Sequence, residues 1–253
     1  MNVVLKPAGI LIVFSIIAVL LWLVVTDQAK LLFSPSGAPI SQDFKAMPTV
    51  KAASPVPMGN AVQQAVDLTR VGATDWVVYG VIPGTLPAKS AVRKKLTTPL
   101  IAPIELVGNG TVSSYANDIR AFRYSDGDES QPTGDDLRSG IVTAGVGSGF
   151  RVIIIPNLNQ RHALKVWVGG VGIRSKLHAR MSDGSPILKV VESYQNTGAG
   201  ERVAFRSLYT VYFRATKPTQ KLILSFLVAD EEKTTEIGAP ADSDVSLQAI
   251  ALD

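Results

Sequence analysis

The chain has 253 residues, which is enough for one sizeable domain with extensions, and its composition excludes several kinds of site. It contains no cysteine, which excludes disulfides, thiol nucleophiles and zinc or iron–sulfur sites built on cysteine. Its 25 basic and 21 acidic residues give a net charge of +4, and the basic residues are scattered along the chain. Because they form no stripe interleaved with aromatic residues, we expect no nucleic-acid partner.

The first element that the sequence predicts is a membrane-spanning helix, because residues 8–25 are an unbroken run without a charge. About 18 helical residues rising 1.5 Å each span roughly 27 Å, close to the thickness of the hydrocarbon core of a bilayer. We therefore predict a single-pass anchor over residues 1–30. The residues of this anchor that we expect to contact the membrane include Ile10, Phe14, Ile17, Leu21 and Trp22.

A cleaved signal peptide is the alternative for this segment. It is disfavoured because the apolar run is long and no pair of small residues at cleavage spacing follows it. Lys6 lies before the run, whereas the charges of Asp27 and Lys30 nearly cancel behind it, which favours an amino terminus in the cytoplasm. We therefore expect an inner-membrane protein whose C-terminal domain is periplasmic or otherwise extracytoplasmic.

Residues 31–60 are predicted to form a linker, because prolines recur there among serine, alanine and glycine. Such a composition favours an extended, semi-rigid spacer that holds a domain away from the membrane. The alternative is that the segment lies along a partner that orders it. Leu31, Leu32 and Phe33 are apolar enough to lie at the membrane interface or against another subunit.

From residue 61 to 253 the pattern is that of an all-β domain, with short, evenly spaced apolar segments separated by glycine- and aspartate-containing turns. A short turn of helix is expected near residues 60–66. Even spacing of short strands predicts an antiparallel β-sandwich of jelly-roll type. The expected strands are 65–69, 76–79, 104–107, 121–124, 140–144, 150–155, 163–168, 176–181, 188–192, 204–215, 221–229 and 245–252.

The strand expected at residues 221–229 is apolar on both faces, so we predict a central position with its second face covered. The glycines at positions 145, 147 and 149 are followed by another strand, at Phe150, instead of a helix. This context predicts a tight turn between strands instead of a dinucleotide site.

Eight motifs, taken together in their order and spacing, resemble a bacterial family of galactose-binding-like β-sandwich domains. The resemblance covers about Val66 to Leu252, and it implies a jelly-roll fold and a binding role instead of a reaction. Val78 and Tyr79 stand where the family's first motif is expected to carry His and Trp, so ligand contacts are not transferred there. The motifs are residues 74–80, 107–111, 124–127, 145–152, 164–170, 176–185, 209–215 and 245–252.

Aromatic residues near strand ends are the main candidates for contacts with a glycan or a partner protein, because sugar rings and protein partners both stack on such side chains. The alternative is that these rings fill the second face of a sheet, and Trp76 in particular is expected in the core. The candidates are Trp76, Tyr79, Tyr115, Tyr124, Trp167 and Tyr194.

The acidic loop around Asp126, Asp128 and Glu129 could supply oxygen ligands to Ca²⁺, although a solvated polar loop is the preferred interpretation. No other metal or cofactor is expected. His162 and His178 are both expected in surface or loop positions, without an acidic or serine partner at the spacing of a triad. No pair of carboxylates stands out for glycoside hydrolysis, so we expect no enzyme.

Three functions are compatible with these patterns. The main hypothesis is a non-catalytic accessory or scaffold subunit of a larger bacterial membrane complex. A photosynthetic, a respiratory or a secretion complex fits the sequence equally well. Its partners would be the membrane and other membrane-protein subunits. The alternative is a membrane-tethered carbohydrate-binding module of the cell envelope. An enzyme whose site the sequence does not reveal is the weakest of the three.

Overall fold

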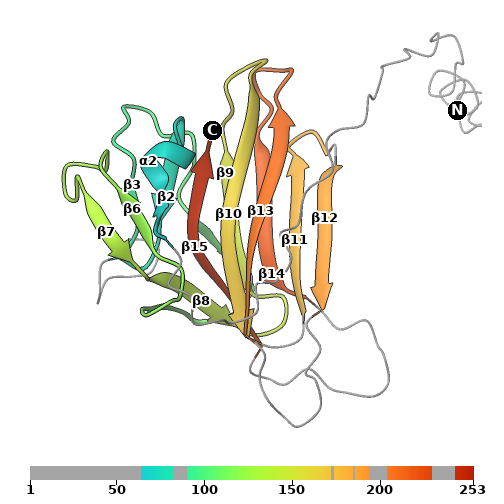
Figure 1. Ribbon diagram of the computed structural model, residues 1–253. Helices are drawn as coiled ribbons and strands as arrows, with labels where there is room; N and C mark the ends of the chain where they lie inside the picture. The colour runs from blue at the N-terminus through green and yellow to red at the C-terminus, as the bar shows by residue number, and fades with distance from the viewer. Residues whose placement is uncertain (1–63, 82–89, 172–173, 185, 194–203, 230–242) are drawn as a thin grey trace, which may run out of the picture. The chain divides into compact units, whose positions relative to one another are not determined.

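The computed structural model describes residues 64–81, 90–171, 174–184, 186–193, 204–229 and 243–253, which all belong to the unit Pro48–Asp253 (Figure 1). The predicted anchor (1–30), the predicted linker (31–60) and the contacts proposed for Leu31, Leu32 and Phe33 lie outside these residues. Within the described part of the chain, no helix is long and apolar enough to cross a membrane.

The larger of two main sheets has seven strands, and its central strand is β15. Strand β10 pairs with β15 along one side, while β2 and β8 share the other side, β2 at the C-terminal half and β8 at the N-terminal half. Strands β13, β3 and β5 extend the sheet outward. The strands are β2 (Asp75–Val78), β3 (Val92–Arg93), β5 (Val112–Tyr115), β8 (Gly140–Ala144), β10 (Arg161–Val171), β13 (Ala204–Arg214) and β15 (Asp244–Leu252).

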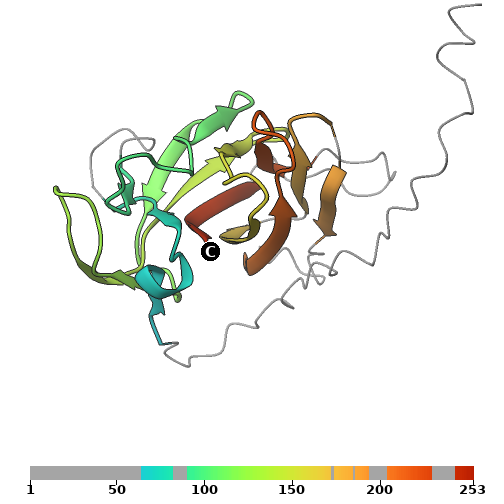
Figure 2. The ribbon, with the colours of Figure 1, turned by 90° about the horizontal axis from the view of Figure 1, so that it is seen from above.

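The second sheet has five strands in the order β12-β11-β14-β9-β4, all antiparallel to their neighbours. Strand β14 is the middle strand, which confirms the central position predicted from its apolar sequence. The two sheets form the layers of a β-sandwich, as Figure 2 shows from above. The strands are β4 (Glu105–Val107), β9 (Gly149–Ile154), β11 (Arg174–Met181), β12 (Pro186–Ser193) and β14 (Leu222–Val228).

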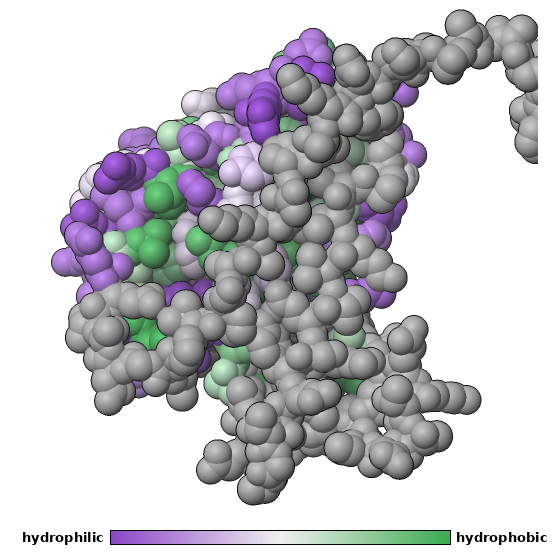
Figure 3. Space-filling model, turned by 45° about the vertical axis from the view of Figure 1, so that its right-hand side comes forward, coloured by the Kyte–Doolittle hydropathy of each residue, from purple (hydrophilic) through white to green (hydrophobic). Residues whose placement is uncertain are grey.

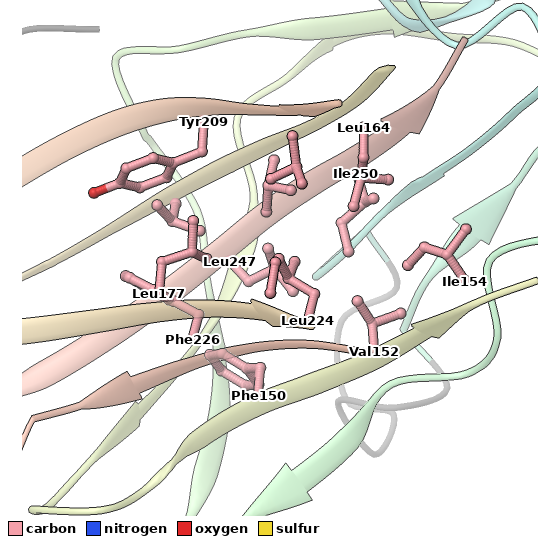
Figure 4. Packing of buried hydrophobic residues seen from close by; sticks show 14 of the residues in the cluster. Phe150, Val152, Ile154, Leu164, Leu177, Tyr209, Leu224, Phe226, Leu247 and Ile250 are labelled. Carbon is pink, nitrogen blue, oxygen red and sulfur yellow. The ribbon is translucent and has the colours of Figure 1, made fainter. Parts of the chain in front are cut away.

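Alternating side chains of both sheets form the core between the layers. Along β13 and β14 buried residues alternate with half-buried ones, which is the two-residue period of strands with one face inward. Phe226 lies opposite Phe150 within one sheet and meets Phe205 of the other sheet edge-on, with ring centroids 6.5 Å apart. Figure 4 shows Leu247 and Ile250 of β15 packed against this cluster.

A third, smaller layer packs on the outer face of the seven-stranded sheet, on the side of β2 and β15 (Figure 1). It contains helix α2 (Leu68–Val71) and the sheet of β1 (Val66–Asp67), β6 (Phe122–Tyr124) and β7 (Gly134–Leu137). This layer explains why every residue of β2 is buried, although a strand with a solvated face would bury only alternate residues. The second hydrophobic cluster so formed consists of Leu68, Trp76, Val78, Val92, Phe122, Tyr124, Trp167, Ala249 and Ala251.

The predicted strands agree with the observed ones except at the start of the domain. The strand expected at 65–69 is wrong beyond Asp67, because α2 begins at Leu68. Asp67 caps this helix by accepting a hydrogen bond from the backbone N–H of Arg70 at 3.4 Å, and Gly72 ends it. The short strands β3, β5 and β7 were not predicted. The glycine run is a turn between β8 and β9, as predicted, with Gly145 and Gly147 at φ 98° and 74°.

Candidate functional site

A pocket of about 260 Å³ lies at the end of the seven-stranded sheet where β10 ends and β13 and β15 begin. Its side chains come from the outward positions of neighbouring strands. Val142 of β8 lies opposite Ser246 of β15, and Ser246 and Arg206 both lie opposite Gly169 of β10. The pocket is therefore a trough across the strands. The residues that supply its polar groups are Tyr115, Asp118, Arg206, Asp244 and Ser246.

Glycines of β10 keep this end of the sheet open. At Gly169 an added Cβ atom would lie 2.9 Å from the Ser246 hydroxyl oxygen and 2.8 Å from the Phe205 carbonyl oxygen. Any larger residue there would push against the backbone of β13 and the side chain of Ser246. Glycine inside a strand often marks a place where another group approaches the backbone closely.

Asp118 and Arg206 form the main polar contact of the pocket. The Arg206 Nε–H donates to both oxygens of the Asp118 carboxylate at 2.9 Å each. The Asp118 side chain is only 2% exposed and the Arg206 side chain 22%, so the pair is largely withdrawn from water. Because a hydrogen-bonded ion pair is both strong and directional, it holds the Asp118 carboxylate and the Arg206 guanidinium in fixed positions at the pocket wall.

Arg120 holds the loop that carries Asp118 against the sheet. Its two terminal nitrogens donate to the carbonyl of Val168 at 2.8 Å and to that of Ser207 at 3.1 Å. The Asp118 carboxylate also accepts the backbone N–H of Arg120 at 2.9 Å. Burial lowers the pKa of Arg120 to about 10, an effect that the Asp118 carboxylate opposes, so the guanidinium stays charged at neutral pH.

The Val168 carbonyl lies beside an irregularity in the sheet. The pairing of β10 with β15 shifts between Trp167 and Val168, which leaves Gln248 as an extra, fully buried residue in β15. A β-bulge of this kind interrupts the regular ladder of hydrogen bonds. We attribute the position of Arg120 to this bulge, because Arg120 donates to the carbonyl at the interruption.

Tyr115 lines the pocket on the side of β5. Its ring lies over Gly140, where an added Cβ would come within 2.6 Å of the hydroxyl oxygen. Burial raises the pKa of Tyr115 to about 12, so its hydroxyl remains protonated at neutral pH. Of the aromatic residues that the sequence suggests as contacts, Tyr115 is thus one that lines the pocket. Tyr194 lies outside the described residues.

The other aromatic candidates do not reach the surface. Trp76, Tyr79, Tyr124 and Trp167 are 0%, 1%, 4% and 4% exposed, so the prediction that they contact a glycan or partner directly is wrong. Three of them fill the cluster beneath the third layer, where Trp76 meets Tyr124 with centroids 4.5 Å apart. Tyr79 faces the main core instead. The alternative interpretation, that these rings fill the faces of the sheets, is confirmed.

Asp126 of the acidic loop fastens the third layer to the seven-stranded sheet. It accepts hydrogen bonds from the Thr69 hydroxyl at 2.6 Å, the Trp76 indole N–H at 2.9 Å and the Lys94 ammonium at 2.6 Å. Burial alone would raise the pKa of the Asp126 carboxyl, but the bonds from Lys94, Thr69 and Trp76 outweigh it and lower the pKa. Asp126 is thus a structural residue, whose carboxylate oxygens accept from groups of the protein.

The remaining acidic residues of this loop are engaged as well. Asp128 accepts the backbone N–H groups of Ser130 and Gln131 at 3.0 and 3.2 Å, and Glu129 pairs with Lys95 at 3.2 Å. Among the residues described, no three His, Cys, Asp or Glu side chains gather in a way that could hold a metal ion. The geometry therefore gives the calcium interpretation of the loop no support.

The two histidines differ in position. His162 is 1% exposed and stacks on Phe213 with centroids 5.5 Å apart, so its predicted surface position is wrong. Its Nε2 accepts the backbone N–H of Asn157 at 3.2 Å, which gives it a structural role at the start of β10. His178 is half-buried between the buried residues Leu177 and Ala179, and so points away from the core as predicted.

Sequence analysis did not identify Asp118, Arg120 or Arg206 as site residues. Asp118 and Arg206 are 88 residues apart, and no motif links them. One local signal is present in the sequence, because Arg206 is a charged residue within an alternating apolar strand and Asp118-x-Arg120 lies one residue before β6. Charged residues at such positions are candidates for a paired, partly buried site.

No protein-family model matches the chain, and no curated protein is significantly similar to it in sequence. Solved structures do resemble it. A tailspike domain of bacteriophage CBA120 has 10% identity and a TM-score of 0.32, over 61% of this chain and 19% of that one. The xylanase 10B modules of Clostridium thermocellum, complexed with xylohexaose, have 12% identity and a TM-score of 0.31, over 59% of this chain and 25% of that one.

A third structure is described as a sugar-binding protein from Bacteroides thetaiotaomicron. It has 8% identity and a TM-score of 0.29, over 59% of this chain and 86% of that one. The chain thus spans 19% and 25% of the first two structures. Similarities with TM-scores this low do not indicate a function for this chain.

Proposed function

We propose that this protein is a non-catalytic carbohydrate-binding module of the galactose-binding-like kind, and that the pocket beside Asp118 and Arg206 holds the sugar. The observation that carries the proposal is the pairing of a buried carboxylate and a guanidinium at the wall of an open pocket. Small-molecule sites typically combine a concave surface with a few fixed polar groups, which is the arrangement here.

The chemistry of the pocket suits a polyhydroxylated ligand. Each sugar hydroxyl can donate one hydrogen bond and accept others, so it is matched by a carboxylate acceptor beside a guanidinium donor. Asp118, Arg206 and the Ser246 hydroxyl provide such groups, and the Tyr115 ring provides an apolar surface. Ligand pockets are commonly about 300–1,000 Å³, so a pocket of about 260 Å³ is suited to a single sugar ring.

The same contacts support binding without catalysis. A general acid or base has to exchange its proton during the reaction. Both oxygens of Asp118 accept the Arg206 Nε–H, and Asp244 accepts the backbone N–H of Val171 at 2.9 Å. Because these oxygens already accept hydrogen bonds from protein groups, the two side chains act as fixed acceptors at the pocket wall.

The membrane location remains part of the proposal. The uncharged run 8–25 supports a single-pass anchor in the inner membrane, with the sandwich domain in the periplasm or beyond. The accessory-subunit hypothesis takes second place, because the outer face of the five-stranded sheet mixes Arg151, His178 and Ser225 with Ile153 and Ile223. Hydrophobic residues also lie among hydrophilic ones on the face seen in Figure 3. Stable obligate interfaces are more uniformly apolar.

Calorimetric titration of the full-length protein in detergent with a panel of oligosaccharides tests the proposal. We expect Arg206→Gln and Asp118→Asn to weaken binding at least tenfold. Arg214→Gln is the matched control, because Arg214 is exposed near the other end of β13 and should leave the affinity unchanged. Release of reducing ends from the sugars would contradict the non-catalytic role, and equal binding by all variants would exclude this pocket.

A further inference from the structure

We infer that the pocket selects uncharged sugar rings over acidic and basic ones, and that Asp118 and Arg206 are the residues that determine this selectivity. This inference rests on the carbohydrate-binding function proposed above. It goes further by stating the charge of the ligand, which follows from how the charges of the pocket are arranged.

The charges at the pocket are balanced within the described residues. Asp118, Asp244 and Arg206 line it, and Arg120 lies directly behind Asp118, with Nε 3.9 Å from the nearer carboxylate oxygen. Two carboxylates and one guanidinium thus line the pocket, and the second guanidinium lies behind Asp118. An uncharged ligand preserves the balance among these four described groups, whereas a charged ligand adds one charge that they do not neutralise.

Burial makes such an imbalance costly. An acidic sugar would compete with Asp118 for the Arg206 guanidinium, and would leave the Asp118 carboxylate, with its 2% exposed side chain, without its main partner. A basic sugar would compete with Arg206 for Asp118 in the same way. Separating a buried ion pair is strongly unfavourable because it leaves an uncompensated charge away from water.

Arg120 cannot replace Arg206 without losing its own contacts. Its terminal nitrogens donate to the carbonyls of Val168 and Ser207, and at 3.9 Å its Nε is beyond hydrogen-bond distance of Asp118. The Nε–H has no hydrogen-bond partner in the described structure. The selectivity therefore depends on the Asp118–Arg206 pair, while Arg120 holds the loop in place.

This arrangement predicts that the preference can be reversed in either direction. Asp118→Asn removes the negative charge between Arg206 and Arg120 and leaves Arg206 without its carboxylate partner, which should favour a uronate. Arg206→Gln removes one positive charge and should favour an amino sugar. Asn has the shape of Asp, so Asp118→Asn tests charge alone, whereas Gln is shorter than Arg but keeps a polar end that can donate a hydrogen bond.

The experiment uses full-length protein in detergent and two matched sets of probes, one based on glucose and one on galactose. Each set contains the methyl glycoside, the methyl uronide and the 2-amino sugar. For the unmodified protein we expect the methyl glycoside to bind at least tenfold more tightly than either charged analogue. In Asp118→Asn the affinity for the uronide relative to that for the glycoside should rise at least tenfold. In Arg206→Gln the affinity for the amino sugar relative to that for the glycoside should rise by at least the same factor.

The outcomes separate this inference from the proposed function. If a charged analogue binds the unmodified protein more tightly, or if both variants leave the ratios unchanged, the inference is overturned while carbohydrate binding stands. If no probe of either set binds, both are overturned. Arg214→Gln is the control in each titration, since a variant of an exposed arginine should leave every ratio as it was.

Discussion

The Nε–H of Arg206 donates to both carboxylate oxygens of Asp118 at 2.9 Å, and this contact joins β13 to a loop 88 residues earlier in the chain. The pair lies at the wall of a pocket on a sheet whose opposite face forms the main core. The position of the site therefore depends on the packing of the sandwich. A substitution that disturbs the loop carrying Asp118 should weaken ligand binding more than it changes the packing of the core.

Arg120→Met should destabilise the protein and loosen the loop that carries Asp118. The change removes two hydrogen bonds from a charged donor to buried carbonyls, each worth about 1.5–3 kcal/mol in comparable cases. We expect the free energy of unfolding, measured by urea denaturation, to fall by at least about 2 kcal/mol. Arg123→Met is the control, because the Arg123 side chain is 49% exposed and pairs with a partly exposed Asp67. Equal effects of the two changes would contradict the anchoring role.

Asp126→Ala should destabilise the third layer. It removes the acceptor of the buried Trp76 indole N–H and the ion-pair partner of Lys94, and an unsatisfied buried group costs about 1–3 kcal/mol. Glu129→Ala is a control from the same loop, with an expected change below about 0.5 kcal/mol, because the Glu129 side chain is 85% exposed. Added Ca²⁺ should leave the melting temperature unchanged; a rise that Asp126→Ala abolishes would restore the calcium interpretation.

The tryptophans of the sandwich should be shielded from solvent and indifferent to ligand. Because the chain has three tryptophans, the variant Trp22→Phe leaves only Trp76 and Trp167 to report. Both are buried beneath the third layer, so acrylamide should quench their fluorescence weakly, with or without sugar. Strong quenching that a saturating sugar prevents would show that these rings are exposed and contact the ligand.

Stability should decrease above pH 10. Burial raises the pKa of Tyr79, Tyr115 and Tyr124 from the ordinary value of 10.0, in the case of Tyr115 to about 12. A raised pKa in the folded state gives stability that is present below pH 10 and is lost as the pH rises toward 12. Arg120, whose pKa burial lowers, changes stability in the opposite direction over this range. With three tyrosines against one arginine, urea denaturation should show lower stability at pH 11 than at pH 8.

Tyr79→Phe should reduce this loss. The Tyr79 hydroxyl is buried without a hydrogen-bond partner in the described structure, so removing it should cost less than about 1 kcal/mol at pH 8. The difference in stability between pH 8 and pH 11 should shrink, because one group with a raised pKa is gone. Tyr212→Phe, which changes a half-buried ring near Arg161, is the control. If the stability difference between pH 8 and pH 11 is unchanged in Tyr79→Phe, Tyr79 is not a source of the loss of stability at high pH.

Most of the fold could be predicted from the sequence, because long strands with one buried face carry a two-residue period. Strands β8, β9 and β14 were predicted to within one residue of their observed bounds, and β14 also in its central place. Of the third layer, β6 is predicted from the sequence, at residues 121–124, but β7 and the packing of this layer on the sheet are not. Strand β7 consists of Gly-Asp-Asp-Leu, whose composition is that of a turn, and it becomes a strand only by pairing with β6.

The site itself could not be predicted, for two physical reasons. The aromatic residues suggested as binding groups are buried because the third layer covers them, and the sequence does not reveal that cover. The Asp118–Arg206 contact exists only because β13 and the loop before β6 meet on one face of the sheet. Ion pairs between distant segments leave no periodic pattern, so only the folded arrangement brings the two groups together.

The decisive experiment is a crystal structure of the protein with a bound sugar. We expect a single ring in the pocket, with hydroxyl groups within about 3.2 Å of the Asp118 carboxylate and the Arg206 guanidinium. We also expect the Asp118–Arg206 contact to persist in the complex. A sugar bound at another face of the domain, or an occupied pocket whose ligand contacts neither residue, would contradict the proposed site.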